Sequence, residues 1–249
     1  MEYINDPIGI IILAAGKGTR MKSDKAKVLH HLSGRPLIMH VVETAAKVEG
    51  KDVVVVVGHE AKIVTEVVSV NADVKFAFQS EQRGTGHAVQ CALPFLSKDC
   101  GHVVILSGDV PLIRHATILN LIEDHLEYEN AVTVLGVCLE NPFGYGRLVE
   151  SGSGGIEKIV EERDADESEK KINIVNSGIY CVKRDFLGHA LSEVTADNNQ
   201  NEIYLTDIVQ IASQSHKKIG LKICDEPTEV MGVNTLHELQ NIETILMGS

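Results

Sequence analysis

A glycine-rich segment follows the first apolar run of the chain and holds residue types that bind phosphate. The run Ile10–Leu13 leads into Ala-Ala-Gly-Lys-Gly-Thr-Arg-Met, residues 14–21. Backbone N–H groups in such a turn bind anionic oxygens, and a mobile lysine and a forked arginine add positive charge. The competing interpretation is a strand-to-helix turn that only needs glycine. The Walker spacing and the third glycine of the dinucleotide fingerprint are absent, so the motif alone identifies no ligand.

The distribution of charge favours phosphate binding at this segment. The 249 residues carry 23 Lys and Arg against 35 Asp and Glu, a net charge of −12. Residues 16–35 hold six bases and one acid, a local charge of +5, which leaves −17 for the rest of the chain. A small anion in a cleft responds to the local field. The acidic remainder repels polyanions, so we expect neither nucleic acid nor membrane as a partner.

A carboxylate follows a second buried run. Val103–Leu106 leads into Ser-Gly-Asp-Val-Pro, residues 107–111. The carboxyl ends of parallel strands meet at one edge, where Asp109 would suit Mg²⁺, a cation that takes one or two protein ligands. The competing interpretation is an aspartate that caps the turn before the proline. Asn234 is a second candidate ligand, provided that Thr235 and not Asn234 caps the helix that follows.

A third polar cluster follows the apolar run Val74–Phe78. It consists of Gln79 and of residues 82–87, Gln-Arg-Gly-Thr-Gly-His, which open a helical segment. A glutamine amide can pair with the edge of a nucleobase, and Gly84 lets the backbone stack closely against the base. Taken alone, the cluster favours a glycine-rich loop before a helix.

Apolar runs alternate with segments of helical period over the first 137 residues. This pattern predicts an α/β fold with a Rossmann-like, doubly wound, mostly parallel sheet that has helices on both faces. The predicted strands are Ile8–Ala15, Asp52–Val57, Val74–Phe78, His102–Leu106 and Ala131–Val137. The predicted helices are Pro36–Val48, Glu60–Val70, Gly84–Leu96 and Arg114–Tyr128.

The second half predicts a small β-rich lobe. The short strands Gly144–Glu150 and Ile156–Glu161 flank a glycine- and serine-rich turn, which indicates a hairpin. Residues 161–171 hold six acids and three bases and predict a solvated loop rather than a binding site. The last helix begins with a capping-box spacing, Thr235-x-x-Glu238. The other predicted elements are strands Ile172–Val182 and Ile219–Cys224 and helices Asp185–Val194, Ile203–Ser215 and Leu236–Met247.

Together these strings resemble the sugar-phosphate nucleotidyltransferases. Residues 13–21 with Lys27-Val28-Leu29 look like the signature of that family. Further strings are similar to the uridyltransferase (pyrophosphorylase) domain of the bacterial bifunctional N-acetylglucosamine-1-phosphate uridyltransferases. The resemblance extends in order and spacing over about residues 8–240. Its further strings are Gln79, 81–88, 108–112, 145–147, 160–161, 176–179, 201–207 and 232–234.

The resemblance implies a role for each matching position. The residues implied to hold the nucleotide, largely by backbone contacts, are Leu13, Ala14, Ala15, Gly16, Gly18 and Gly108. Uracil recognition is implied for Gln79, Gly84 and Thr85. The implied catalytic residues are Arg20, Lys27 and Asp109, of which Arg20 and Lys27 neutralise the triphosphate. Mg²⁺ is implied on Asp109 and Asn234.

The second substrate is implied to contact Gly146, Glu161 and Asn176, so Glu161 is withdrawn from the solvated loop. The implied fold is the GT-A-like nucleotidyltransferase fold. The implied reaction is the Mg²⁺-dependent formation of UDP-N-acetylglucosamine, a cell wall precursor, and pyrophosphate from UTP and N-acetylglucosamine 1-phosphate. Two alternatives stay open: a nucleotidyltransferase for another sugar or alcohol phosphate, and a non-catalytic nucleotide-sugar sensor.

The sequence departs from the family pattern in two respects. Ser107 stands where tyrosine commonly precedes Gly-Asp, so one side-chain contact is lost. The chain also ends at Ser249 without the left-handed β-helix of the bifunctional members, so we do not expect acetyl transfer. Whether it is a stand-alone enzyme or a segment of a longer one stays open.

We expect one domain over residues 1–249, because no repeat or proline-rich linker divides it. Within it, residues 8–137 are expected to bind nucleotide, 138–233 to bind sugar and include the β-rich lobe, and 234–249 to form the C-terminal helix, through which oligomers could form. A cytoplasmic location is expected, because five scattered cysteines indicate reduced thiols and no signal peptide is apparent.

Overall fold

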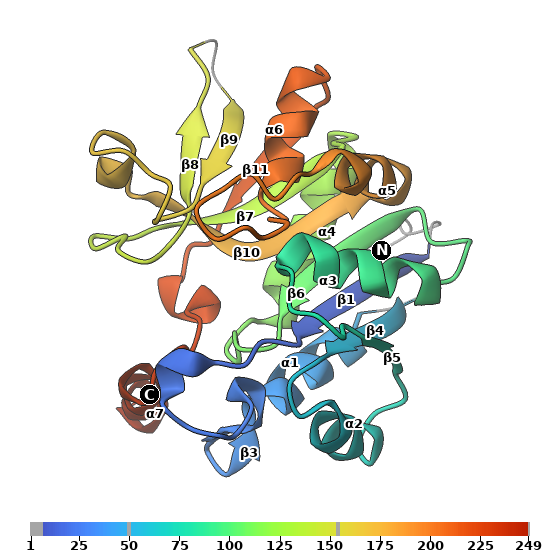
Figure 1. The fold of residues 1–249 in the computed structure, drawn as a ribbon, viewed down its shortest axis with the longest axis vertical. Helices are drawn as coiled ribbons and strands as arrows, with labels where there is room; N and C mark the ends of the chain where they lie inside the picture. Colours follow the sequence, from blue (N-terminus) through green and yellow to red (C-terminus); the bar gives the residue numbers. More distant parts are fainter. Residues whose placement is uncertain (1–6, 49–50, 153–154, 249) are drawn as a thin grey trace.

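The computed structural model describes residues 7–48, 51–152 and 155–248. Its main feature is a mixed sheet whose central path runs β11-β7-β10-β6-β1-β4-β5 (Figure 1). The strands of this path are β1 (Ile8–Ala14), β4 (Lys51–Val57), β5 (Lys75–Phe78), β6 (His102–Ser107), β7 (Val132–Cys138), β10 (Ile174–Lys183) and β11 (Ile219–Ile223). The predicted α/β class with a mostly parallel sheet is confirmed.

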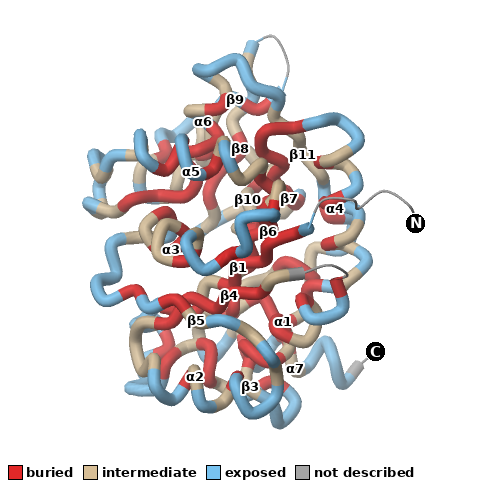
Figure 2. The backbone as a smooth tube through the Cα atoms, turned by 90° about the vertical axis from the view of Figure 1, so that its right-hand side faces the viewer, coloured by how far each residue is buried: buried red, intermediate tan, exposed pale blue. Residues whose placement is uncertain are grey.

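Helices cover both faces of the sheet (Figure 2). On one face lie α1 (Leu37–Ala46), α2 (Ala61–Ser69) and α4 (His115–Glu127). On the other lie α3 (Thr85–Ala92), α5 (Arg184–Glu193) and α6 (Asp207–Gln214). Alternate β1 residues serve the two cores, since Ile10 and Ile12 pack with the first group of helices and Ile11 with the second. In the described residues, no helix is both long and apolar enough to cross a bilayer.

Strand β10 runs against its neighbours. It pairs antiparallel with β6 and β7, whereas β1 pairs parallel with β4 and β6. The first residues of β10 therefore lie at the edge where the parallel strands end, with Asn176 opposite Gly136 near the end of β7. A bulge follows at once, and Gly178 within it has a φ of 79°. This places Asn176 at the same edge as the loops that follow β1 and β6.

The β-rich lobe is a hairpin of β8 (Arg147–Glu150) and β9 (Ile156–Val160) beside the main sheet. It joins the sheet through the pair Arg147 and Val175, and Figure 1 shows it next to α6. Leu148, Ile156 and Ile159 pack in the same apolar core as α6. The predicted hairpin is confirmed, while its turn includes residues 153–154, which lie outside the described part.

Several element boundaries differ from prediction. The predicted helix 84–96 ends at Ala92 and continues as the 3₁₀ turn η3 (Leu93–Phe95), because Pro94 has no N–H to donate to the helix. The predicted helix 203–215 begins only at Asp207, because the residues before it pair with the loop that opens α3. Short elements missed by the sequence pattern are β2 (His31–Leu32), β3 (Arg35–Pro36), η1 (Thr19–Met21), η2 (Lys27–Leu29), η4 (Glu169–Lys171) and η5 (Pro227–Val230).

The C-terminal helix α7 (Leu236–Gly248) starts with the predicted capping box. The Glu238 N–H donates to Thr235 Oγ1 at 3.1 Å, and the Thr235 N–H donates to Glu238 Oε2 at 2.8 Å. The Asn234 N–H donates to the same carboxylate at 2.7 Å, while its side-chain Oδ1 accepts from Arg20 and Lys27 and does not cap the helix. Ile242 of the helix and Met21, the residue in place of a third loop glycine, belong to one apolar cluster.

We expect Thr235→Ala to lower the free energy of unfolding by about 1 kcal/mol, because the Glu238 N–H loses its partner. Thr244→Ala, at an exposed site later in the same helix, is the matched control. It should change the free energy of unfolding by no more than about 0.5 kcal/mol. Urea titrations monitored by circular dichroism provide the comparison. Equal midpoints for the two variants would show that the cap does not stabilise the protein.

Candidate active site

The glycine-rich loop is shaped by two different glycines. Gly18 has a φ of 63°, and a Cβ on it would lie 2.5 Å from Cβ of Lys27, so both backbone and packing demand glycine. A Cβ on Gly16 would meet nothing within 4 Å. Gly18 therefore lets Lys27 pack closely against the loop backbone, while Gly16 borders open space at the end of β1.

Four side chains from distant parts of the sequence form one polar cluster. The Lys27 ammonium forms an ion pair with Asp109 and donates to Asn234 Oδ1 at 3.0 Å. Arg20 Nη2 donates to the same Asn234 oxygen at 2.9 Å. The side chains of Lys27 and Asp109 are only 17% and 16% exposed. Two predicted cations and two predicted metal ligands thus lie within direct contact of one another.

Backbone contacts hold this cluster at the edge of the sheet. Leu13 lies opposite Ser107 where β1 pairs with β6, and the Gly108 N–H donates to the Leu13 carbonyl at 2.9 Å. The Val233 N–H donates to the Asp109 carbonyl at 2.9 Å. Asp109 is therefore fixed between the end of β1 and the segment that precedes α7.

A residue that sequence reasoning missed, Glu60, holds the loop that precedes Lys27. It follows β4, has a φ of 51°, and accepts a hydrogen bond from the Ala26 N–H. Its neighbour His59 donates its backbone N–H to the Ala15 carbonyl at 3.1 Å. The residues that follow β4 thus hold the segment 15–26 at both of its ends, at Ala15 and at Ala26. A lone acid after Gly-His is not a recognisable motif, so no sequence signal pointed to this role.

Gln79 is 3% exposed at the end of β5. Its Nε2 donates to the Gly84 carbonyl at 3.0 Å and lies 3.1 Å from His87 Nδ1. The amide nitrogen is engaged within the protein, which leaves Oε1 as the group of this amide that can accept a hydrogen bond from a ligand.

Gly84 is required for a reason that the sequence analysis did not give. Its φ is 106°, and a Cβ on it would lie 2.5 Å from the Ile203 carbonyl oxygen. The Gly86 N–H donates to that oxygen at 2.8 Å, and Thr85 Oγ1 accepts the Leu205 N–H at 3.0 Å. The protein's own backbone therefore occupies the Cβ side of Gly84, and the expected stacking against a base stays a prediction for the other face.

The three residues implied for the second substrate lie together. The Asn176 N–H donates to the Gly146 carbonyl at 2.8 Å, and a Cβ on Gly146 would lie 3.6 Å from Glu161 Oε2. Glu161 accepts a hydrogen bond from the Thr206 hydroxyl at 3.4 Å. Burial raises the pKa of Glu161, and the nearby Asp164 adds to this effect. Gly146, Glu161 and Asn176 thus form a second polar cluster, between the β-rich lobe and the main sheet.

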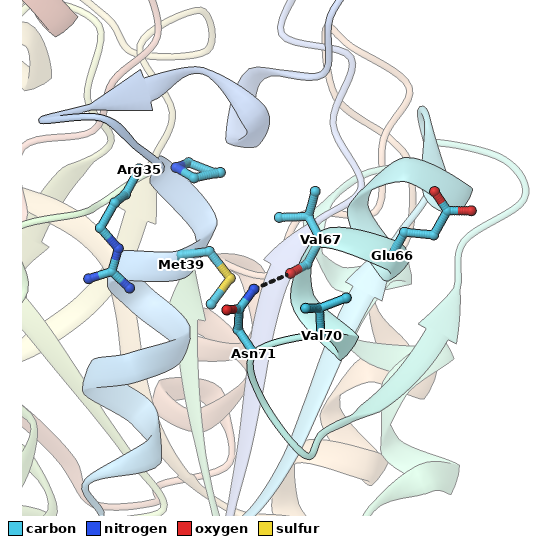
Figure 3. Close-up of a pocket in the computed structure, with 7 residues that line it drawn as sticks. Arg35, Met39, Glu66, Val67, Val70 and Asn71 are labelled. Atoms are coloured by element: carbon cyan, nitrogen blue, oxygen red, sulfur yellow. Dashed lines mark hydrogen bonds between the residues drawn. The ribbon is translucent and has the colours of Figure 1, made fainter.

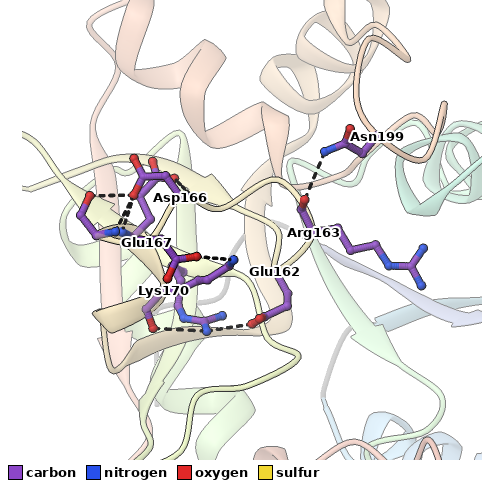
Figure 4. Close-up of polar contacts among 9 residues, drawn as sticks. Glu162, Arg163, Asp166, Glu167, Lys170 and Asn199 are labelled. Atoms are coloured by element: carbon purple, nitrogen blue, oxygen red, sulfur yellow. Dashed lines mark hydrogen bonds and ion pairs between the residues drawn. The ribbon is translucent and has the colours of Figure 1, made fainter.

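Within the acidic segment 162–171 only Ala165 is buried, as expected of a solvated loop, and hydrogen bonds also anchor the segment to the lobe. Glu162 accepts from the buried Arg147 Nη2 at 2.8 Å and from the Gly144 N–H at 3.0 Å. Asp166 accepts from the side chain and backbone of Ser168, and these bonds lower its pKa. Figure 4 also shows Asn199 bonded to the Arg163 carbonyl. The charge count predicted the exposure of this segment but not its ion pair with Arg147.

Tyr145 borders the polar cluster, and the sequence analysis assigned it no role. Burial raises the pKa of its hydroxyl, and the charges of Glu238 and Asp109 raise it further. Tyr145 precedes Gly146, so two consecutive residues lie near Asp109 and near Asn176, respectively, at the edge where the parallel strands end.

The Asp109 and Asn234 oxygens converge on one cation, the Lys27 ammonium. A carboxylate and an amide oxygen form a donor set that suits a hard divalent cation whose other ligands are phosphate and water. Among the described residues, no group of three or more His, Cys, Asp or Glu could hold a metal. An all-protein metal cage of those residue types is thus absent from the described ranges.

A surface hollow between α1 and α2 lies outside this cluster (Figure 3). Its lining is largely apolar, and Asn71 Nδ2 within it donates to the Val67 carbonyl at 2.9 Å. None of the predicted site residues lines it. The residues around it are Arg35, Pro36, Met39, Glu66, Val67, Val70 and Asn71.

Comparisons with known proteins fit this arrangement. A family model described as the MobA-like NTP transferase domain matches residues 10–149. The protein of Desulfotalea psychrophila named Bifunctional protein GlmU is 44% identical over 234 residues, covering 94% of this chain and 69% of that protein. The proteins of the same name from Geotalea uraniireducens and Caldanaerobacter subterraneus are 45% and 46% identical. They are covered over 53% and 51% of their length and cover 97% and 95% of this chain. The chain thus spans about half of these two relatives.

A solved structure shares the fold. It is a Bacillus anthracis protein named for glucose-1-phosphate thymidylyltransferase activity and solved in complex with a sucrose. The TM-score is 0.74, with 96% of this chain and 94% of that chain covered and 18% of residues identical. At this identity the likeness concerns the fold alone.

The acids near Glu161 predict a pH effect on stability. Burial raises the pKa of Asp207 to about 6, and the nearby Asp164 contributes. The unfolded value is about 3.9, so the stability that the bound proton provides is lost as the pH rises from about 4 through about 6. The free energy of unfolding of Asp207→Asn, relative to that of the wild type, should therefore rise by about 1 kcal/mol between pH 4.5 and pH 7.5, after allowance for partial solvent screening.

Urea unfolding of both proteins at the two pH values measures this difference. Asp197→Asn removes a charge at an exposed site and serves as the control. Parallel pH profiles for the wild type and Asp207→Asn would contradict the prediction.

Proposed function

The chain belongs to the MobA-like NTP transferase family, and from this premise we propose that it transfers a uridylyl group from UTP to N-acetylglucosamine 1-phosphate. The products are UDP-N-acetylglucosamine and pyrophosphate. The observation that supports this most directly is the contact cluster of Arg20, Lys27, Asp109 and Asn234. It brings cations and metal-binding oxygens to the loop where a triphosphate would bind. The proposal concerns this chain and not the rest of its longer relatives.

The nucleotide would lie along the ends of β1 and β5. Leu13, Ala14 and Ala15 supply backbone at the end of β1, and Gly16 borders open space there. The engaged nitrogen of Gln79 leaves Oε1 to accept the N3–H of uracil. Arg20 and Lys27 would then neutralise the triphosphate.

The sugar phosphate would bind at the cluster of Gly146, Glu161 and Asn176. The carboxylate of Glu161 and the amide of Asn176 are hydrogen-bonding groups that suit sugar hydroxyl and acetamido groups. Under this proposal residues 8–137 bind the nucleotide and 138–233 the sugar. The use of a nucleoside triphosphate suggests a cytoplasmic reaction. Association through α7 also remains a proposal, since Leu236 and Met247 on it are exposed.

Magnesium fits the oxygen pair at the polar cluster. Asp109 and Asn234 would hold it, and Lys27, which now contacts both, would be released toward the phosphates. When bound, the ion neutralises charge on the reacting phosphates. The donor set of one carboxylate and one amide leaves room for phosphate and water ligands.

The attacking group is an oxygen of the sugar phosphate, and it needs no protein base. Its second pKa is about 6, so it is largely dianionic at neutral pH. The phosphate oxygen forms a bond to the α-phosphorus of UTP while the bond to the pyrophosphate oxygen breaks. The residues of this chain hold two anions in line and stabilise the charge on the leaving group. The absence of a nucleophile motif from the sequence agrees with this mechanism.

We expect Lys27→Ala or Asp109→Ala to lower the turnover number by at least about 100-fold, the scale of losing one key electrostatic group. Lys25→Ala removes an exposed lysine from the same loop and is the matched control, with near-normal turnover. Coupled detection of pyrophosphate gives the rates. Near-normal pyrophosphate release by either site variant would refute the assignment.

A substrate panel separates the alternatives. UTP, CTP, dTTP and ATP are each tested with N-acetylglucosamine 1-phosphate, glucose 1-phosphate and an alcohol phosphate. We expect the highest kcat/KM for UTP with N-acetylglucosamine 1-phosphate. A preference for another pair would keep the reaction class and change the substrate, and binding of UDP-N-acetylglucosamine without pyrophosphate exchange would indicate a sensor.

A further inference from the structure

The Gln79 carboxamide is held from several directions. Its backbone N–H donates to the Val57 carbonyl at 2.9 Å, which extends the pairing of β5 with β4. Its Nε2 lies 3.0 Å from the Gly84 carbonyl oxygen and 3.1 Å from His87 Nδ1. Both amide hydrogens thus have acceptors within the protein, and the amide is fixed before a ligand binds.

The partners determine which end of the amide faces them. A backbone carbonyl only accepts hydrogen bonds, so the nitrogen of Gln79 must face Gly84. His87 Nδ1 receives the second hydrogen and must therefore be unprotonated. The ring proton then resides on Nε2, which lies 3.8 Å from Cys91 Sγ.

Cys91 supports this form of the ring. Burial raises the pKa of its thiol, so the sulfur stays neutral and does not attract a second proton to His87. A thiol sulfur accepts a weak hydrogen bond from Nε2–H. Cys91, His87 and Gln79 therefore form a directed chain that ends at Gln79 Oε1.

We propose that His87 is a positioning residue that determines pyrimidine specificity by holding Gln79 with Oε1 toward the base. Uracil has a hydrogen-bond donor at N3, whereas cytosine has an acceptor there. The fixed Oε1 accepts from uracil and repels cytosine, and a site built around one hydrogen bond discriminates by leaving the wrong ligand unpaired. This inference rests on the proposed uracil site and adds His87 to it.

The test measures the dissociation constants of UTP and CTP by calorimetry in the presence of MgCl₂. In His87→Ala one amide hydrogen loses its acceptor, so the ratio of CTP to UTP dissociation constants should fall by about 10-fold or more. His87→Asn should restore most of the ratio, because Asn Oδ1 takes the place of Nδ1. His87→Gln, whose polar end reaches the Nε2 position, should not restore it.

A second measurement uses the unmodified protein. Long-range ¹⁵N–¹H spectra, with His87 assigned from the His87→Asn spectrum, should show a neutral ring protonated on Nε2. A ring protonated on Nδ1 would overturn the proposal, even if a variant fails to fold.

The outcomes separate this inference from the proposed function. If the wild type favours UTP and His87→Ala keeps the same preference, the positioning role is wrong while uridylyl transfer stands. If the wild type binds UTP and CTP equally, the specificity role of His87 is wrong, and the substrate panel alone decides uridylyl transfer. A loss of preference in His87→Ala together with its return in His87→Asn supports the role of the ring nitrogen, which a purely structural role would not produce.

Discussion

The contact of one ammonium group with two oxygens organises the functional edge of this protein. Lys27 meets Asp109 and Asn234 at a place where neither acid nor base is widely exposed. Separating a partly buried pair leaves an unmatched charge, so the segments that hold these residues are constrained together. The pairing of β1 with β6 places Asp109, and the bond of the Ala26 N–H to Glu60 holds the loop before Lys27. The Val233 N–H, bonded to the Asp109 carbonyl, places Asn234. A polyanion that binds here would replace the carboxylate as the partner of Lys27.

One segment links the two halves of the edge. Ile203 packs its backbone on Gly84, Leu205 donates to Thr85, and Thr206 donates to Glu161. The residues proposed to read the base and those proposed to hold the sugar thus share a support four residues long. The helix expected from Ile203 begins only at Asp207, because residues 203–206 hydrogen-bond to the loop that opens α3 and to Glu161.

Sequence periodicity was sufficient for the buried strands and for the helices between them, because strands covered on both faces have few polar residues. It was also sufficient for the α7 cap, whose spacing is local. It could not supply the reversed direction of β10, which depends on a long return of the chain. Nor could it supply the partner of Gly84, because Ile203 is remote in sequence. The sequence pattern predicted the exposure of the acidic segment, but it could not supply the ion pair of Glu162 with Arg147 on β8. At the site, the residue types were predictable, whereas the supports at Glu60, His87 and Thr206 emerged only from tertiary contacts.

A crystal structure of this chain with UDP-N-acetylglucosamine and Mg²⁺ tests the central claim most directly. The account predicts density for the diphosphate beside Arg20 and Lys27, with the metal on Asp109 and Asn234. It further predicts uracil N3 within hydrogen-bonding distance of Gln79 Oε1 and the amino sugar against Glu161 and Asn176. A product molecule bound elsewhere, such as in the hollow between α1 and α2, with the Lys27 and Asp109 contact intact, would contradict it.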